Sequence, residues 1–278
     1  MEDGHTVQSE TKTERWKSRF LSSILAVASR SLLFRDRLMR VTRRLRKHDA
    51  REEFFIASGK RKLSCVYVPG VEFGPAVLLC HGIGETVQHW SAVQALLHDR
   101  GIGSLVFNYS GFGRSTGRIC AEHCDEDLAT AYSELRRRVG PKTPIFVLGY
   151  SLGSGIAAHG AAALKPTIAG LFLCEAFDSF RGAARAMNVP HWLTHLVPDV
   201  WVTVRAVERL CMPVWVIHSD GDRLFPLEMA RRIKDACGSG SELIIVKGLA
   251  HNEPYLTAAE TYWQPIIERT MSFPRGMH

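Results

Sequence analysis

The chain has 278 residues, of which 46% are hydrophobic, 23% charged and 9% aromatic, and its formal net charge is +7. This length and composition are typical of a soluble globular protein, so they exclude a disulfide-stapled miniprotein, a fibre, wholesale disorder and an integral membrane bundle. Residues 1–51 carry 13 Lys and Arg against 6 Asp and Glu, whereas residues 52–278 carry 22 of each sign. This distribution argues against nucleic-acid binding by the main domain, because phosphate recognition needs a basic docking surface.

Residues 1–50 are predicted to form a basic N-terminal extension, separate from a domain over residues 51–278. The only apolar stretch of the extension, residues 20–28, is too short to span a bilayer, and arginines interrupt its continuation. Acidic residues near the start argue against a mitochondrial presequence, and against a secretory signal although Ala26-Val-Ala28 resembles a cleavage site. Two other interpretations stay open: an amphipathic helix within residues 15–47 that contacts an anionic membrane peripherally, and a helix that packs on its own domain or extends into solvent.

From Arg51 onward, short β-branched runs bounded by Gly or Pro alternate with helical patterns. Strands are predicted at residues 53–57, 63–68, 76–80, 103–109, 145–149, 168–175, 214–219 and 243–247, and helices at 87–100, 122–139, 155–164, 227–236 and 258–271. This alternation predicts an α/β fold with a mostly parallel central sheet and helices on both faces. Residues 178–212, rich in Trp, Met, Pro and Arg, interrupt the alternation and predict a small cap insertion.

Seven cysteines are present, and some, such as Cys80 and Cys174, lie inside apolar runs where a thiol behaves as a small hydrophobe. The odd number fits a reducing compartment, so we expect a cytoplasmic protein, peripheral to a membrane if the extension binds one. Cys120 and Cys124 have the spacing of a metal clip. No second cluster with zinc-type spacing follows, which favours ordinary thiols.

A G-x-S-x-G motif, Gly149-Tyr150-Ser151-Leu152-Gly153, falls between a predicted strand and a predicted small-residue helix. This is the context that a nucleophile elbow requires. A serine on such a sharp turn is lifted above the sheet, and neighbouring chains approach so closely that side chains two positions to either side would clash. The motif therefore predicts Ser151 as a nucleophile.

A serine hydroxyl needs a base and a carboxylate that orients the base, and in this context the chain order should be Ser, Asp or Glu, then His. Asp220 and Asp222 follow the strand at 214–219, and His251 follows the strand at 243–247. We favour a turn role for Asp220. The order and the positions at strand ends predict Ser151, Asp222 and His251 as a triad, although Asp222 in a turn and His251 on a surface loop are the plainer alternatives.

Two backbone N–H groups are expected to hold the oxyanion of a tetrahedral intermediate. One belongs to Leu152, directly after the nucleophile. The other is assigned to Ile83, in the loop His81-Gly82-Ile83-Gly84 that follows a buried strand, with His81 shaping the loop. Gly111-Phe112-Gly113 is reminiscent of a dinucleotide loop, but it lacks the third glycine and the following helix. No cofactor and no metal are expected.

With these motifs, the chain resembles the α/β-hydrolase superfamily, in particular small-capped serine esterases, lipases and acyl-hydrolases. The resemblance runs from about Phe54 to Met271 and rests on the loop 81–84, the loop 108–117, the elbow, Asp222 with Pro226, and residues 248–252. It implies the α/β-hydrolase fold, a buttressing role for the loop 108–117, and an acid four residues before a proline, Asp222. Glu175 follows a central strand where some relatives carry their acid, so it is a second candidate.

The expected function is that of a serine hydrolase that cleaves an ester, thioester or related acyl bond of a small-molecule or lipid-like substrate. A catalytically idle member of the fold, used as a binding or signalling module, is the alternative, and an intact triad argues against it. The apolar side chains of the cap either line an acyl pocket or pack the cap onto the sheet: Met187, Trp192, Leu193, Leu196, Val197, Val200 and Trp201. The oligomeric state is left open.

Overall fold

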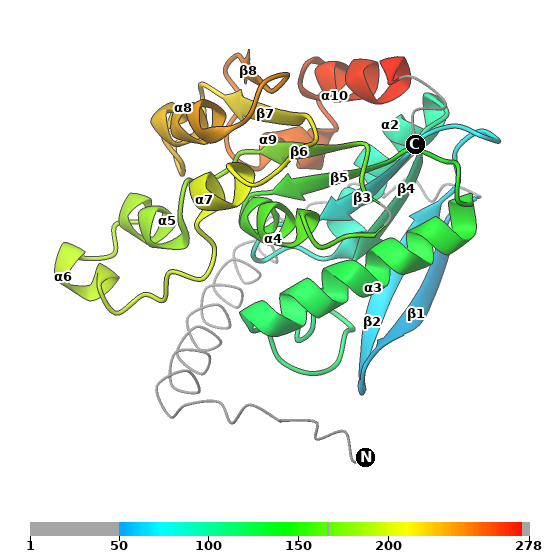
Figure 1. Ribbon diagram of the computed structural model, residues 1–278, viewed down its shortest axis with the longest axis horizontal. Helices are drawn as coiled ribbons and strands as arrows, with labels where there is room; N and C mark the ends of the chain where they lie inside the picture. Colours follow the sequence, from blue (N-terminus) through cyan, green and yellow to red (C-terminus); the bar gives the residue numbers. More distant parts are fainter. Residues whose placement is uncertain (1–49, 166, 274–278) are drawn as a thin grey trace, which may run out of the picture.

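The structure, a computed structural model, describes residues 50–165 and 167–273 (Figure 1). The predicted extension over residues 1–50, with its amphipathic helix at 15–47, lies outside the described residues except for Ala50. Eight strands form one sheet in the order β1-β2-β4-β3-β5-β6-β7-β8. The strands are β1 (Glu52–Ser58), β2 (Arg61–Val68), β3 (Ala76–Cys80), β4 (Gly103–Phe107), β5 (Ile145–Tyr150), β6 (Gly170–Cys174), β7 (Val214–Ser219) and β8 (Glu242–Val246).

Strand pairing confirms the mostly parallel sheet that the alternating pattern predicts. The pairs β1–β2 and β2–β4 are antiparallel, and the five pairs from β4–β3 to β7–β8 are parallel. Parallel strands need crossover connections, and the helices that supply them cover both faces of the sheet. All carboxyl ends of the parallel strands therefore lie along one edge of the sheet, where open α/β sheets hold their sites.

Two hydrophobic clusters, one on each face of the sheet, form the core. Side chains alternate along β3, so Leu78 belongs to one cluster and Val77 and Leu79 belong to the other. The first cluster lies under α3 (Ala121–Val139), α4 (Leu152–Ala161) and α8 (Leu227–Ala236), and the second lies under η1 (Val87–Trp90), α2 (Ser91–Asp99), α9 (Glu253–Thr257) and α10 (Glu260–Ser272). The helices predicted on both faces are confirmed (Figure 1).

The helices differ from the prediction chiefly in three places. The helix predicted at 155–164 begins three residues earlier, at Leu152, although Gly153 and Gly155 have low helix propensity. The helix predicted at 87–100 consists of a 3₁₀ turn followed by α2, and α9 is a separate helix ahead of the predicted C-terminal one. Five residues are too few for a periodic signal, so α9 escapes a pattern-based search.

Residues 175–213 connect β6 to β7 and hold α5 (Phe180–Ala186), α6 (His191–Thr194) and α7 (Thr203–Val207). This insertion occupies the region of the predicted cap, and α5 and α6 extend beyond the sheet edge (Figure 1). No helix among the described residues has the length and apolar character needed to cross a bilayer.

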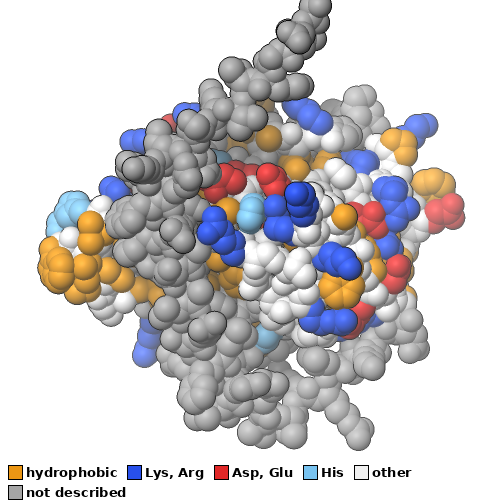
Figure 2. All heavy atoms as spheres, turned by 90° about the horizontal axis from the view of Figure 1, so that it is seen from below, with side chains coloured by type: hydrophobic (Ala, Val, Ile, Leu, Met, Phe, Trp, Pro, Cys, Tyr) orange, Lys and Arg blue, Asp and Glu red, His pale blue; other side chains and the backbone are white. Residues whose placement is uncertain are grey.

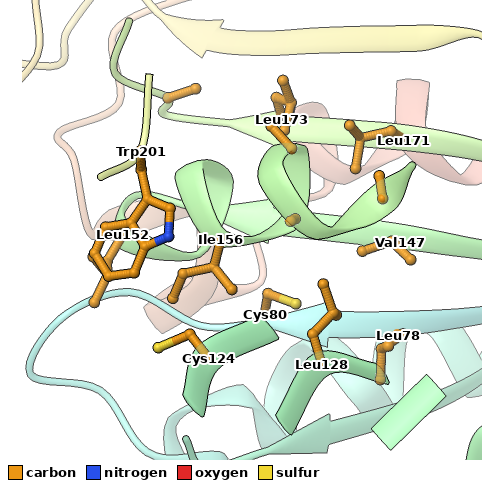
Figure 3. Close-up of a cluster of buried hydrophobic side chains, with 14 of the residues drawn as sticks. Leu78, Cys80, Cys124, Leu128, Val147, Leu152, Ile156, Leu171, Leu173 and Trp201 are labelled. Carbon is orange, nitrogen blue, oxygen red and sulfur yellow. The ribbon is translucent and has the colours of Figure 1, made fainter. Parts of the chain in front are cut away.

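The apolar side chains of the insertion divide into two groups. Trp201 and Val197 are buried, and Trp201 lies beside Leu152 and Ile156 of α4 (Figure 3). Met187, Trp192 and Leu196 are instead 43%, 71% and 47% exposed. Hydrophobic and histidine side chains gather at this end of the molecule (Figure 2). Packing therefore accounts for Trp201 and Val197, and not for the exposed group.

Candidate active site

Ser151 lies on the turn between β5 and α4, in a backbone conformation that only a surrounding structure can hold. Its φ is 52° and its ψ is −117°, outside the regions that L-residues normally populate. The Ser151 N–H donates to the Cys174 carbonyl (3.0 Å), and the Ser151 carbonyl accepts from the Ser154 N–H (2.9 Å). Bonds from β6 and from α4 thus fix both sides of the strained residue.

Gly149 and Gly153 are required by close backbone approach, as the motif predicts. A Cβ on Gly149 would lie 2.4 Å from the Gly153 carbonyl oxygen. A Cβ on Gly153 would lie 2.0 Å from the Cys80 carbonyl oxygen at the end of β3. The elbow therefore fits between β3, β5 and α4 only if both positions lack a side chain.

The structure brings Ser151, His251 and Asp222 together from three loops at the same sheet edge. His251 Nε2 lies 3.0 Å from Ser151 Oγ, and His251 Nδ1 lies 2.7 Å from Asp222 Oδ2. The Asp222 side chain is fully buried, and the His251 side chain is 11% exposed. The Tyr150 hydroxyl donates to the His251 carbonyl, and the Phe225 ring lies edge-on to the imidazole at 5.1 Å. The base is therefore held by its backbone as well as by Asp222.

Asp222 keeps a negative charge in spite of its burial. Its Oδ1 accepts from the backbone N–H groups of Leu224 (2.6 Å) and Phe225 (3.2 Å). Burial raises the pKa of Asp222, but hydrogen bonds from His251, Glu175 and the Leu224 N–H outweigh that effect and lower it below its usual value. An ionised Asp222 can hold the His251 tautomer that accepts a proton at Nε2.

Glu175 lies directly behind Asp222. Its side chain is fully buried, and its Oε1 accepts from the Ser219 N–H (2.9 Å). Burial, the hydrogen bond to Asp222 and repulsion from that carboxylate raise the pKa of Glu175 to about 10. Among the described residues, one group of side chains has the spacing of possible metal ligands. In this group, one carboxyl oxygen of Glu175, one of Asp222 and a ring nitrogen of His251 lie within 4.8 Å of one another. Within this group, the contact between His251 and Asp222 is the hydrogen bond between Nδ1 and Oδ2 (2.7 Å).

The loop that carries Ile83 contacts the nucleophile. A Cβ on Gly82 would lie 3.2 Å from Ser151 Cβ and 2.3 Å from Glu85 Oε1, so the loop, the serine and the Glu85 carboxyl surround one small space. Leu152 is the first residue of α4, and its N–H therefore lacks an intrahelical acceptor. The two backbone groups assigned to the oxyanion belong to segments on either side of Ser151.

Buried polar contacts fix this loop. Glu85 Oε2 accepts from the Gly82 N–H and from Trp90 Nε1, both at 2.9 Å. Burial raises the pKa of Glu85 to about 7. The Tyr109 hydroxyl donates to the His81 carbonyl (3.0 Å), and Asn108 Oδ1 accepts from the Val87 N–H (3.0 Å). The segment 108–117 therefore does contact the loop that it is implied to buttress.

Other candidate residues have structural contacts. Asp220 accepts from Lys247 Nζ (2.9 Å) and from the Gly248 N–H (2.8 Å), as the favoured turn role predicts. Cys120 and Cys124 are buried, and burial raises both thiol pKa values. A cavity of about 210 Å³ lies between β2, α3 and the loop at 70–75, and none of its lining residues belongs to the triad.

Sequence reasoning missed Glu85, His218 and the Tyr150 hydroxyl as parts of the site. Glu85 follows the glycine loop directly, and His218 is the one ionisable residue in the apolar strand β7. An acid beside a glycine loop and a histidine in a buried strand are signals of buried polar contacts. Their partners come from distant segments, so the sequence alone does not identify them.

A family model described as the alpha/beta hydrolase fold matches residues 75–200. An uncharacterized protein of Mycobacterium tuberculosis is 30% identical over 187 residues, which are 66% of this chain and 65% of that protein. The lysophosphatidylserine lipase ABHD12 of Danio rerio is 24% identical over 188 residues, 61% of this chain and 49% of that protein. The chain thus matches about half to two thirds of the length of these relatives.

Two solved structures resemble the fold at low sequence identity. The esterase Pf2001 of Pyrococcus furiosus has a TM-score of 0.63 and 19% identity, and the match covers 81% of this chain and 91% of that one. The esterase of Exiguobacterium antarcticum has a TM-score of 0.62 and 16% identity, with 80% and 100% covered. The sheet topology, the family model and these likenesses agree, and the chain has the α/β-hydrolase fold.

Proposed function

We propose that the chain is a serine hydrolase that cleaves an ester, thioester or related acyl bond. The observation that carries this proposal is the continuous contact from Ser151 Oγ to His251 Nε2 (3.0 Å) and from His251 Nδ1 to Asp222 Oδ2 (2.7 Å). A serine within reach of a base, and a base oriented by a carboxylate, form the arrangement that activates a hydroxyl.

The reaction runs in two halves. His251 removes the proton of Ser151 as Oγ attacks the acyl carbonyl, and Asp222 stabilises the imidazolium that forms. The N–H groups of Leu152 and Ile83 hold the oxyanion, and His251 then gives the proton to the leaving group. Water, activated by the same imidazole, releases the acyl group and restores Ser151.

An acyl ester of small or lipid-like size is the proposed substrate. The esterases with the same fold and the lysophosphatidylserine lipase of Danio rerio support an acyl ester as the bond cleaved. Exposed Met187, Trp192 and Leu196 in the insertion offer an apolar surface to an acyl chain. Peripheral membrane contact through residues 15–47 is proposed from the basic sequence of that segment.

A fluorophosphonate probe, followed by peptide mapping, tests this function. We expect labelling at Ser151 in the full chain and none in Ser151→Ala, whose turnover of a p-nitrophenyl ester should fall by about 10⁴-fold or more. Ser133→Ala is the matched control, because this serine lies on the exposed side of α3, where its Oγ donates to the Ala129 carbonyl (2.9 Å). Folded protein that reacts neither with the probe nor with esters and thioesters of several chain lengths would favour the binding-module alternative.

A further inference from the structure

A second carboxyl group lies behind the acid of the proposed triad. Glu175 follows β6 with a positive φ of 45°, and its N–H donates to the Ile217 carbonyl (3.0 Å) of β7. This conformation turns the side chain into the space between β6 and β7, where no part of it is exposed. A glutamate held in a left-handed conformation at full burial indicates that the surrounding strands fix its position.

One oxygen of Glu175 is left without a conventional partner. Oε1 accepts from the Ser219 N–H, but among the described residues no donor reaches Oε2. His218 Nδ1 lies 3.7 Å from Oε2 and is also unpartnered. His218 Nε2 lies 3.0 Å from the Phe225 carbonyl, so the imidazole proton sits on Nε2 and Nδ1 has only a lone pair.

The arrangement is explained if Glu175 carries a proton. One carboxyl oxygen of Glu175 and one of Asp222 lie within 4.8 Å of each other, and two ionised carboxylates at that separation have no donor between them. Among the ion pairs of the described residues, only histidines approach these two acids. Two negative charges without a permanent cation cannot both persist in a buried space, so one proton stays with the pair.

We infer that Glu175 is a positioning residue whose carboxyl proton is donated to Asp222, and that Glu175 can substitute for Asp222 when that residue is lost. The inference rests on the proposed function. In the intact site, the donated hydrogen bond fixes the Asp222 carboxylate toward His251 Nδ1. Without Asp222, the repelling charge is gone, and the Glu175 carboxyl is left as the remaining acid of this group, with an oxygen within 4.8 Å of a ring nitrogen of His251.

The test uses four variants of the full chain: Glu175→Gln, Glu175→Leu, Asp222→Ala and the double variant of Asp222→Ala with Glu175→Gln. Gln keeps a donor toward Asp222 and an acceptor for the Ser219 N–H, so its kcat should stay within about threefold of the wild type. Leu removes both groups, and kcat should fall by about tenfold or more with KM unchanged, because the residue acts through Asp222 and His251 rather than on substrate.

The double variant shows whether Glu175 acts in place of Asp222 or only packs behind it. Asp222→Ala should lower kcat by less than the ~10⁴-fold that is typical when a triad acid is missing. Adding Glu175→Gln to this variant should lower kcat by at least a further tenfold. If adding Glu175→Gln to Asp222→Ala lowers kcat no more than Glu175→Gln does alone, Glu175 does not act in place of Asp222. Equal kcat values in the Gln and Leu variants would overturn the positioning role.

Fluorophosphonate labelling tests the proposed hydrolase function independently of this inference. If wild-type protein labels at Ser151 and turns over ester, the proposed function stands whatever the Glu175 variants do. A melting curve of each variant identifies loss of fold, and the Gln variant, which is isosteric with Glu, keeps the comparison valid should Leu prevent folding.

Discussion

The sheet edge that carries the triad, which includes Glu175, and the rest of the insertion, over residues 176–213, have opposite characters. At the edge, buried polar groups are tied by backbone bonds, and two residues, Ser151 and Glu175, sit at positive φ. In the insertion, short helices leave Met187, Trp192 and Leu196 exposed. The edge therefore holds the proposed reacting atoms through buried contacts, whereas the insertion leaves several apolar side chains on the surface.

The contrast has an energetic basis. Strain and buried polar groups cost free energy, and they persist only where rigid strands determine them. Here the strands β3, β5, β6 and β7 are buried on both faces. The insertion contacts this body through α7, which packs on α4 and α8, and through Trp201, whose Cβ would lie 2.9 Å from a Cβ on Gly155 of α4.

Truncation of Trp201 should have the largest effect on stability. Trp201→Ala deletes a fully buried indole, and we expect the free energy of unfolding to fall by about 3–5 kcal/mol, measured by urea denaturation. Trp201 Nε1 is buried with no partner among the described residues, so Trp201→Phe should cost less than half as much, because it also removes an unsatisfied N–H. Equal losses for Ala and Phe would contradict the packing role.

The second largest effect is expected from a side chain added to Gly153 in the elbow. Gly153→Ala places a Cβ 2.0 Å from a backbone oxygen of β3, so α4 must shift. We expect a loss of about 2–3 kcal/mol in unfolding free energy and loss of ester turnover even where the protein stays folded. Gly238→Ala is the matched control, because its nearest neighbour lies 4.0 Å away and its φ is not positive. If both variants behave alike, the close approach carries no cost.

Much of the edge could be predicted from the sequence because its signals are local. The elbow motif, the order of Ser151, Asp222 and His251, and the glycines around the nucleophile are each read within a few residues. Parallel strands bring their carboxyl ends to one edge, which turns three separate loops into one predicted site. The structure places these three side chains within hydrogen-bond distance of one another.

The parts that escaped prediction depend on contacts between distant segments. Glu85 and Trp90 are close in sequence, yet only the fold reveals that the Trp90 Nε1–H and the Gly82 N–H both donate to Glu85 Oε2. The role of His218 in an apolar strand becomes clear only where the Phe225 carbonyl accepts a hydrogen bond from its Nε2 (3.0 Å). The insertion has weak periodicity, because its helices α5 to α7 are at most seven residues long.

A pH series sharpens the view of Glu175 as a protonated buried acid. The pKa of Glu175 is raised from the ordinary glutamate value of 4.5 to about 10 in the folded chain, so between these values the unfolded state loses a proton that the folded state keeps. Stability from this group therefore falls as pH rises through that window, by roughly 1 kcal/mol per pH unit.

Glu175→Gln should remove this slope. Urea denaturation between pH 5 and pH 8 should show a flatter dependence for the Gln variant than for the wild type. Glu72→Gln, in an exposed loop, is the control and should leave the wild-type slope in place. Parallel curves for wild type and Glu175→Gln would mean that Glu175 is ionised in the folded protein.

The smallest effect is expected at the exposed end of the insertion. Trp192 is 71% exposed, so Trp192→Ala should change the free energy of unfolding by less than about 0.5 kcal/mol. Turnover of p-nitrophenyl acetate should also be unchanged, because an acetyl group is too short to reach a surface used by a long acyl chain. The same chemical change thus separates two parts of the insertion: a tryptophan deleted at position 201 removes a core contact, and one deleted at position 192 removes only surface. A stability loss at Trp192 comparable to that at Trp201 would contradict the division of the insertion into a packed part and an exposed end.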